Sequence, residues 1–416
     1  MRIGRLATCL VAALLVLAAC GLGTPSAAPT VRPELVWSRA DIDLPDDVSE
    51  IAPGSTPGMV CSPCHAEQAS LMLAVTATPG GFLAVGVQLP PPSAIAYEST
   101  DGRAWVPVPG FAPGDETRAL GVASDAAGRV VIVGTAGSSA GAWTRETPGS
   151  PWRPVPDQPS LRAPAGGTAE MRAVTAWGDG WVAAGSVGAA DGSRRAAIWW
   201  SGDGRAWELV PAAADDPGDA RAFGVAADGG RVVVVGASLA DGTGGAITWT
   251  ATDGETWTRA EGGVLDTGAM RAVTAMPDGF VAVGVGSADD RAAAWVSADG
   301  IAWEAVPDQD ALANDGQPIR MLGVTAAGGP EGTGGAPGVA TGWDGIMAAG
   351  WESDAGNGSG VIWRSADGRT WERVPSQASM SGGSLSGVAV TGGTPVVVGT
   401  TGSPDNDQAS AWFPDP

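Results

Sequence analysis

One nine-residue pattern constrains the fold of this chain more than any other feature. An aromatic residue, a turn reading S-x-D-G and a tryptophan follow at fixed spacing, as in W-V-S-A-D-G-I-A-W at 295–303. Flanking aromatics around such a turn predict two antiparallel strands, with Asp capping backbone amides and Gly taking a positive φ. The copies span 97–105, 199–207, 249–257 (with Thr250 and Ala251 in the first turn positions), 295–303, 363–371 and, in degraded form, 143–152.

The sequence around these copies repeats as well. Each unit opens with an apolar strand, passes a short Gly- or Asp-containing turn, and has a second strand that we expect to end at a recurrent glycine. These glycines are Gly86, Gly134, Gly185, Gly236, Gly284, Gly350 and Gly399. Four short strands in a unit of about 50 residues predict one blade of a β-propeller.

The S-x-D-G-x-x-W string resembles the Asp-box, or BNR, repeat of sialidase-like propellers, although it is one residue shorter than the usual S-x-D-x-G-x-x-W. In that family the box is a structural turn at the outer edge of a blade, away from the active site. The resemblance therefore implies an all-β propeller in which these aspartates are architectural. It implies no catalytic residue.

Seven third-strand aromatics predict seven blades: Tyr97, Trp143, Trp199, Trp249, Trp295, Trp363 and Trp412. Only four residues follow the last of them, so its blade needs a fourth strand from elsewhere. The segment Leu35-Val36-Trp37 resembles a fourth strand, and pairing it with residues 410–412 would close the ring and remove both sheet edges. We predict a seven-bladed propeller over 35–416 whose last blade is closed by an N-terminal strand.

The first 34 residues form a targeting region. Arg2 and Arg5 precede an apolar run over 10–19, which is short for a membrane span. The run ends in Leu17-Ala18-Ala19-Cys20, which resembles a bacterial lipobox and implies lipid attachment at Cys20. We expect a lipoprotein signal peptide over 1–19, a tether over 20–34 and an extracytoplasmic, membrane-anchored product; an ordinary secretory signal is the alternative.

The charge excludes one class of partner. The formal net charge is −22 at pH 7, and all 23 basic residues are arginine. An acidic chain of this kind repels nucleic acid at long range. We expect no nucleic-acid partner.

Cys61-Ser62-Pro63-Cys64-His65 allows three interpretations. In an oxidising compartment the two cysteines predict a local disulfide. The spacing also matches c-type haem attachment, with His65 the sole histidine, but few apolar residues remain to enclose a haem. A free or redox-active pair is the third. We favour the disulfide and predict no cofactor.

Catalytic residues are not evident. Sialidases use a Tyr nucleophile, and the only tyrosine, Tyr97, occupies a position that tryptophan fills in other units. A carboxylate pair of the usual glycosidase type remains open. Two acidic clusters, 405–407 and the set Asp308, Asp310, Asn314 and Asp315, have oxygen ligands for Ca²⁺ but lack the spacing of a calcium loop. We predict no metal site.

Tryptophans fall into two groups. Thirteen of the 18 occupy the two repeat positions and are expected in the core between blades. The exceptions are available to stack on a sugar ring or are exposed without a role. They are Trp177, Trp181, Trp200, Trp343 and Trp351.

A recurrent arginine provides the candidate binding site. First strands line the channel of a propeller, and we expect their arginines to ring one mouth: Arg118, Arg172, Arg221, Arg271 and Arg320. Bringing several guanidinium groups together is unfavourable unless carboxylates or a bound anion neutralise their positive charge. Glu116, Glu170 and Asp219 precede three of these arginines by two residues, so local ion pairs are one interpretation.

The other interpretation is an anionic ligand. The sequence thus favours a monomeric, non-catalytic binding or scaffold protein whose partner is a cell-envelope protein or an anionic glycan. The alternative is a glycan hydrolase or lyase on the same scaffold.

Overall fold

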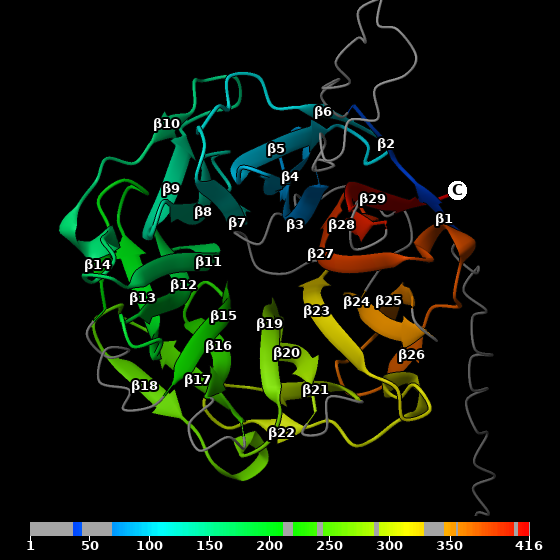
Figure 1. The fold of residues 1–416 in the computed structure, drawn as a ribbon. Helices are drawn as coiled ribbons and strands as arrows, with labels where there is room; N and C mark the ends of the chain where they lie inside the picture. The colour runs from blue at the N-terminus through cyan, green and yellow to red at the C-terminus, as the bar shows by residue number, and fades with distance from the viewer. Residues whose placement is uncertain are drawn as a thin grey trace, which may run out of the picture. The chain divides into compact units, whose positions relative to one another are not determined.

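Each repeat unit folds into one antiparallel sheet, and the seven sheets are arranged radially around a central channel (Figure 1). The computed structural model describes residues 36–43, 69–210, 219–238, 244–286, 291–327, 345–354, 357–402 and 407–415. These lie in one compact unit, Leu35–Pro416. The predicted seven-bladed β-propeller is confirmed.

Blades 1 to 7 are numbered in chain order and share one strand plan. The innermost strands are β3 (Ala69–Thr78), β7 (Thr117–Ser124), β11 (Thr168–Trp177), β15 (Ala220–Ala227), β19 (Ala269–Met276), β23 (Ile319–Ala326) and β27 (Gly383–Thr391). The second strands are β4 (Gly81–Leu89), β8 (Val130–Ala136), β12 (Gly180–Gly188), β16 (Val232–Ser238), β20 (Gly279–Val285), β24 (Ile346–Asp354) and β28 (Thr394–Thr401).

The third strands are β5 (Ser93–Ser99), β9 (Ser139–Arg145), β13 (Arg194–Ser201), β17 (Gly245–Ala251), β21 (Ala292–Ser297), β25 (Asn357–Ser365) and β29 (Gln408–Pro414). The outermost strands are β6 (Ala104–Pro107), β10 (Arg153–Pro154), β14 (Glu208–Leu209), β18 (Trp257–Ala260), β22 (Glu304–Ala305), β26 (Trp371–Arg373) and β1 (Trp37–Arg39). In the part of the chain that the structure describes, short 3-10 helices precede four of the blades: η1 (Pro159–Leu161), η3 (Gly263–Leu265), η4 (Asp310–Leu312) and η5 (Ala378–Met380). No helix in the described residues has the length and apolar character needed to cross a membrane.

Every innermost strand carries a β-bulge opposite the recurrent glycine. In blade 3 the pairing shifts between Met171 and Ala173, which leaves Arg172 as the extra residue. The bulge brings the Glu170 carbonyl oxygen onto Gly185, where any Cβ would overlap it. The same overlap holds at all seven recurrent glycines, so the bulge explains why a side chain is absent there. The second strands continue past this glycine, and the expectation that they end at it is wrong.

Antiparallel pairing divides the turns between two faces. Turns that join first to second strands, and third to fourth strands, lie on one face, here the turn face; the remaining connections lie on the opposite face. The S-x-D-G turns therefore belong to the turn face. In blade 5 the Asp299 carboxylate accepts the N–H groups of Ile301 and Ala302 at 2.9 and 2.8 Å, and the Trp303 indole donates to the Gly300 carbonyl at 3.0 Å.

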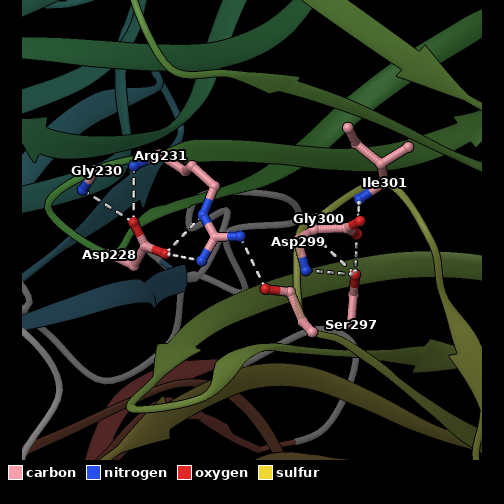
Figure 2. Close-up of polar contacts among 8 residues, drawn as sticks. Asp228, Gly230, Arg231, Ser297, Asp299, Gly300 and Ile301 are labelled. Carbon is pink, nitrogen blue, oxygen red and sulfur yellow. Dashed lines mark hydrogen bonds and ion pairs between the residues drawn. The ribbon is translucent and has the colours of Figure 1, made fainter.

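Each S-x-D-G turn also contacts the preceding blade. Figure 2 shows the contact between blades 4 and 5: Asp228 holds Arg231 by an ion pair of 2.7 Å, and the guanidinium donates to the Ala298 carbonyl at 2.8 Å. The Thr250 hydroxyl of blade 4 donates to the Gly300 carbonyl at 2.8 Å. The turn therefore fastens adjacent blades as well as reversing the chain.

The N-terminal strand closes the ring. β1 pairs antiparallel with β29, with Trp37 opposite Pro414 and Arg39 opposite Trp412. Trp37 is only 2% exposed, and its N–H donates to the Gln377 side chain. Gln158 and Gln309 make the same bond to fourth-strand tryptophans in blades 3 and 6, so Trp37 occupies their register.

One strand was not predicted. After closing blade 7 the chain forms β2 (Asp41–Ile42), which pairs in parallel with β6 and makes blade 1 five-stranded. The N-terminal segment thus joins blade 7 to blade 1 across the closure. Two residues carry no periodic pattern, which is why the sequence does not indicate this strand.

Replacing Trp37 tests the closure. We expect Trp37→Ala to lower the free energy of unfolding by about 3–5 kcal/mol, since it empties a buried site in the closing blade. Denaturant unfolding measures the change, and Val36→Ala, at a side chain 58% exposed, is the control. Equal stability of the two variants would contradict a closing role for β1.

Replacing a recurrent glycine tests the bulge. Gly185→Ala should destabilise the protein by about 1–3 kcal/mol or more, because its Cβ meets rigid backbone and not a movable side chain. Gly80→Ala is the matched control, since a Cβ there has no atom within 4 Å. Thermal unfolding should separate the two variants clearly; similar midpoints would mean that the bulge accommodates a methyl group.

Candidate functional site

The central channel is built from three consecutive residues of each innermost strand, and it encloses a cavity of about 370 Å³. The innermost strands contact one another all the way round, from β3 through β27 and back to β3. Glycine or alanine occupies the middle position because adjacent strands approach closely there. A Cβ on Gly121, for example, would lie 2.6 Å from the Arg172 carbonyl oxygen of the next blade.

The bulged residues form one ring of this channel. Each is the extra residue of its innermost strand. It lies nearer to the start of that strand than to its end, and so toward the face opposite the turn face. They are Leu73, Leu120, Arg172, Phe223, Arg271, Leu322 and Ser386.

The structure separates the five predicted arginines into two sets. Arg172 and Arg271 are bulged residues and line the cavity. Arg118, Arg221 and Arg320 lie two residues before the bulge of their own strands, in the register of Glu170. The expectation of a single ring is therefore wrong, because the bulge separates the arginines into two positions that the sequence pattern does not distinguish.

Arg172 belongs to an ion-pair network. Glu170 accepts from Arg172 at 3.0 Å, from Arg194 at 3.3 Å and from the Ser186 hydroxyl at 3.0 Å. Burial alone would raise the pKa of Glu170, but the two arginines and the hydroxyl hold this pKa below its usual value. The local pairing expected for Glu170 is thus present, and one carboxylate faces two guanidinium groups.

Phe223 lies between the two channel arginines in the ring. The guanidinium carbon of Arg271 is 4.3 Å from the centroid of the Phe223 ring, and that of Arg172 is 5.8 Å away. A cation over an aromatic face is stabilised without losing its N–H donors. The Arg172 side chain donates to Glu170 through Nε and Nη2, and it is 38% exposed.

The other three arginines have different surroundings. Arg118 is exposed, and the Arg320 guanidinium lies 5.6 Å from the centroid of Trp351. Among the described residues, the buried Nε atoms of Arg221 and Arg320 and the Oδ1 of Asp219 have no hydrogen-bond partner. No ion pair links Asp219 to Arg221, or Glu116 to Arg118, within this part of the chain.

Tyr97 has no nucleophilic role in this geometry. It is 2% exposed in the core between blades 7 and 1. Burial, and then the Asp43 carboxylate, raise the pKa of Tyr97 to about 12. A phenol that is both inaccessible and hard to ionise does not attack a sugar.

Other candidates are placed individually. Asp308 pairs with Arg291 at 3.4 Å, Asp310 begins η4, and the Asn314 amide donates to the Ser353 carbonyl at 2.8 Å. In the described ranges no group of three or more His, Cys, Asp or Glu side chains is arranged to hold a metal ion. The lipid-attachment residue Cys20, the pair Cys61 and Cys64 with His65, and residues 405–406 lie outside those ranges.

The tryptophans largely follow the prediction. Of the thirteen repeat tryptophans, all but Trp152 and Trp257 are buried. Trp181 is 1% exposed and is a core residue, so it does not belong among the candidates for sugar stacking. Trp177, Trp200 and Trp351 retain exposed surface, and Trp343 lies outside the described residues.

Sequence reasoning missed Phe223, Ser186 and Arg194. Phe223 would have been found by aligning first strands from their recurrent glycines, since it follows Ala222, the partner of Gly236, just as Arg172 follows the partner of Gly185. No sequence signal marked Ser186 or Arg194, because they meet Glu170 only through strand pairing.

No protein-family model matches the sequence, and no curated protein matches it. Solved structures match at low identity. YCF48 from Cyanidioschyzon merolae has a TM-score of 0.51 and 14% identity over 91% of this chain and 98% of that one. A structure of YCF48 bound to D1 peptide has a TM-score of 0.49 and 15% identity over 86% and 97%. Trypanosoma rangeli sialidase has a TM-score of 0.44 and 12% identity over 91% of this chain but 59% of its own. At these identities the likeness shows the propeller fold alone.

Removing the Glu170 charge tests the network. Glu170→Gln should lower the free energy of unfolding by about 1–3 kcal/mol at pH 7, since two guanidinium groups lose their shared carboxylate. A depressed pKa in the folded state contributes stability above the unfolded pKa, and that stability is lost as the pH falls through the folded value. The variant should therefore lose less stability than the wild type between pH 7 and pH 3.

Denaturant unfolding at both pH values measures this difference. Glu208→Gln, at an exposed carboxylate on β14, is the control and should behave as the wild type. An identical acid dependence in the wild type and Glu170→Gln would contradict the network.

Proposed function

We propose that this protein is a non-catalytic binding or scaffold protein, and that its channel holds an anionic group of a cell-envelope protein or of an anionic glycan. One observation carries the proposal: Arg172 and Arg271, in the bulged ring, place two guanidinium groups over Phe223 beside a cavity. Planar guanidinium groups bind carboxylates through paired charge-assisted hydrogen bonds.

The charge balance of the site supports an anion. Glu170 forms ion pairs with both Arg172 and Arg194, so these three groups together carry a net positive charge in a chain of formal charge −22. A carboxylate bound in the channel lies beside the guanidinium groups of Arg172 and Arg271 in a partly desolvated site, where ionic attraction is stronger than in water.

The sequence supports a cell-surface setting for this function. The lipobox resemblance at Leu17–Cys20 leads us to propose a lipid anchor at Cys20 and an extracytoplasmic propeller. We also assign the S-x-D-G turns to the Asp-box type, on the basis of their sequence and their capping aspartates. The alternative of a sialidase-like enzyme loses support, since the only tyrosine is buried with a raised pKa.

Binding of polygalacturonate and of poly-glutamate, measured by calorimetry, tests the proposal with one carboxylated glycan and one acidic peptide. The wild type should bind at least one of them, with weaker affinity at high salt. Arg172→Gln with Arg271→Gln should weaken binding by about tenfold or more, since charge-assisted bonds are lost.

Two controls separate binding from folding and from overall charge. Arg271→Gln alone leaves the Glu170 network in place and should weaken binding. Arg153→Gln removes a charge from an exposed outer strand and should bind as the wild type does. Binding of neither ligand, or equal binding by the double variant, would refute the channel site.

A further inference from the structure

Two tryptophans outside the repeat pattern lie together on the turn face of blades 3 and 4. Trp177 ends β11, and Trp200 is the penultimate residue of β13. Both reach the turn of the next blade: a Cβ on Gly254 would lie 3.3 Å from Cζ3 of Trp177 and 4.0 Å from Nε1 of Trp200. Trp200 is 37% exposed and Trp177 is half-buried. The two indoles therefore form one surface, here called the tryptophan platform.

The turn of blade 3 is adapted to this arrangement. A Cβ on Gly202 would lie 3.3 Å from Cη2 of Trp200, a tight contact for an aromatic ring. The equivalent turns of four other blades have a larger residue at that place, the blade-4 turn having Ala251 in place of the serine: Thr100, Thr252, Ala298 and Ala366. Glycine at 202 thus leaves room for the ring of Trp200 along its own turn.

The platform retains unused hydrogen-bonding groups. Most repeat tryptophans satisfy their indole N–H internally, as Trp207 does with the Gly204 carbonyl at 3.0 Å. Among the described residues, the indole nitrogens of Trp177 and Trp200 donate no hydrogen bond. Asp203, which follows Gly202, uses Oδ1 to accept from its own turn, and its Oδ2 accepts none from this part of the chain. A ligand that is only apolar would desolvate these groups without compensation.

Charged neighbours of both signs surround the platform. Asp179, Asp203 and Asp253 are exposed on the same turns. Arg129 lies beside them and donates to the Asp179 carbonyl at 3.2 Å, and Arg205 follows Asp203 by two residues. The aspartates oppose an anionic ligand; because Arg129 is paired with Asp125 at 2.5 Å, it is Arg205 that opposes a cationic one. A neutral ligand with hydroxyl groups avoids both penalties.

We propose that the tryptophan platform binds a neutral glycan, with sugar rings stacked on Trp200 and Trp177. A pyranose has an apolar C–H face for an indole and peripheral hydroxyls, which can accept from the indole N–H groups and donate to the Asp203 carboxylate. This site lies at the turn face and not in the channel, and it does not depend on the proposed anion site.

Native affinity electrophoresis tests the proposal with the full chain. Gels contain one neutral polysaccharide each, from a panel of a glucan, a mannan, a galactan and an arabinan. At least one should retard the wild type, and Trp200→Ala should weaken this binding by about tenfold or more, because stacked area is lost at an exposed residue. The thermal midpoint of Trp200→Ala should stay near that of the wild type.

The controls distinguish the platform from other surfaces. Ile301→Ala, at a residue 41% exposed in the equivalent turn of blade 5, should be retarded as the wild type is. Arg172→Gln with Arg271→Gln should also be retarded normally, so failure of the channel site leaves this result intact. Failure of the whole panel to retard the wild type overturns the proposal. Unchanged retardation of Trp200→Ala also overturns it. A platform that binds tetramethylammonium but no glycan would overturn it as well.

Discussion

The rest of the structure depends on the extra residue in the innermost strand of every blade. Because the bulge turns a carbonyl oxygen toward the second strand, the facing residue must be glycine, and seven glycines satisfy this requirement. The residue after each bulge is glycine or alanine, which lets neighbouring blades meet at backbone distance around the channel. The bulged residue is thereby directed into the channel. The same bulge therefore determines both which positions must be glycine and which residues line the candidate site.

Much of the fold could be predicted from the sequence because its signals are local and repeated. The S-x-D-G turn, the aromatics on either side of it and the recurrent glycine each report on one blade, and Trp37 lies at a fourth-strand position because its neighbours match that pattern. The strand β2 was missed since its two residues are held by backbone bonds, such as Asp41 N–H to the Arg103 carbonyl at 2.8 Å, that any sequence can make.

The candidate site was harder to predict for a related reason. The sequence pattern gives Arg118 and Arg172 the same place, at the opening of a first strand, whereas in the structure Arg118 lies two residues before its bulge and Arg172 is itself the bulged residue. The sequence contains a correct reference point, since each recurrent glycine faces the bulge, and only that alignment brings Phe223 between Arg172 and Arg271. The partners Ser186 and Arg194 come from the second and third strands of the same blade, where pairing register and not sequence distance decides contact.

Specific surfaces arise in this fold where a unit departs from its repeat. A repeated residue is constrained by contacts that all blades share: the Trp303 indole has to reach the Gly300 carbonyl, and Gly284 has to face a bulge. Positions outside those contacts are free to differ without cost to the fold. Phe223 is the one aromatic residue of the bulged ring, and Gly202 stands beneath Trp200 where the equivalent turns have threonine or alanine. The first departure lies in the channel and the second on the turn face, so two surfaces of different chemistry can coexist on one scaffold. Ring closure by β1 supports both, because an open seventh blade would loosen the packing between neighbouring sheets on which the channel and the turns rely.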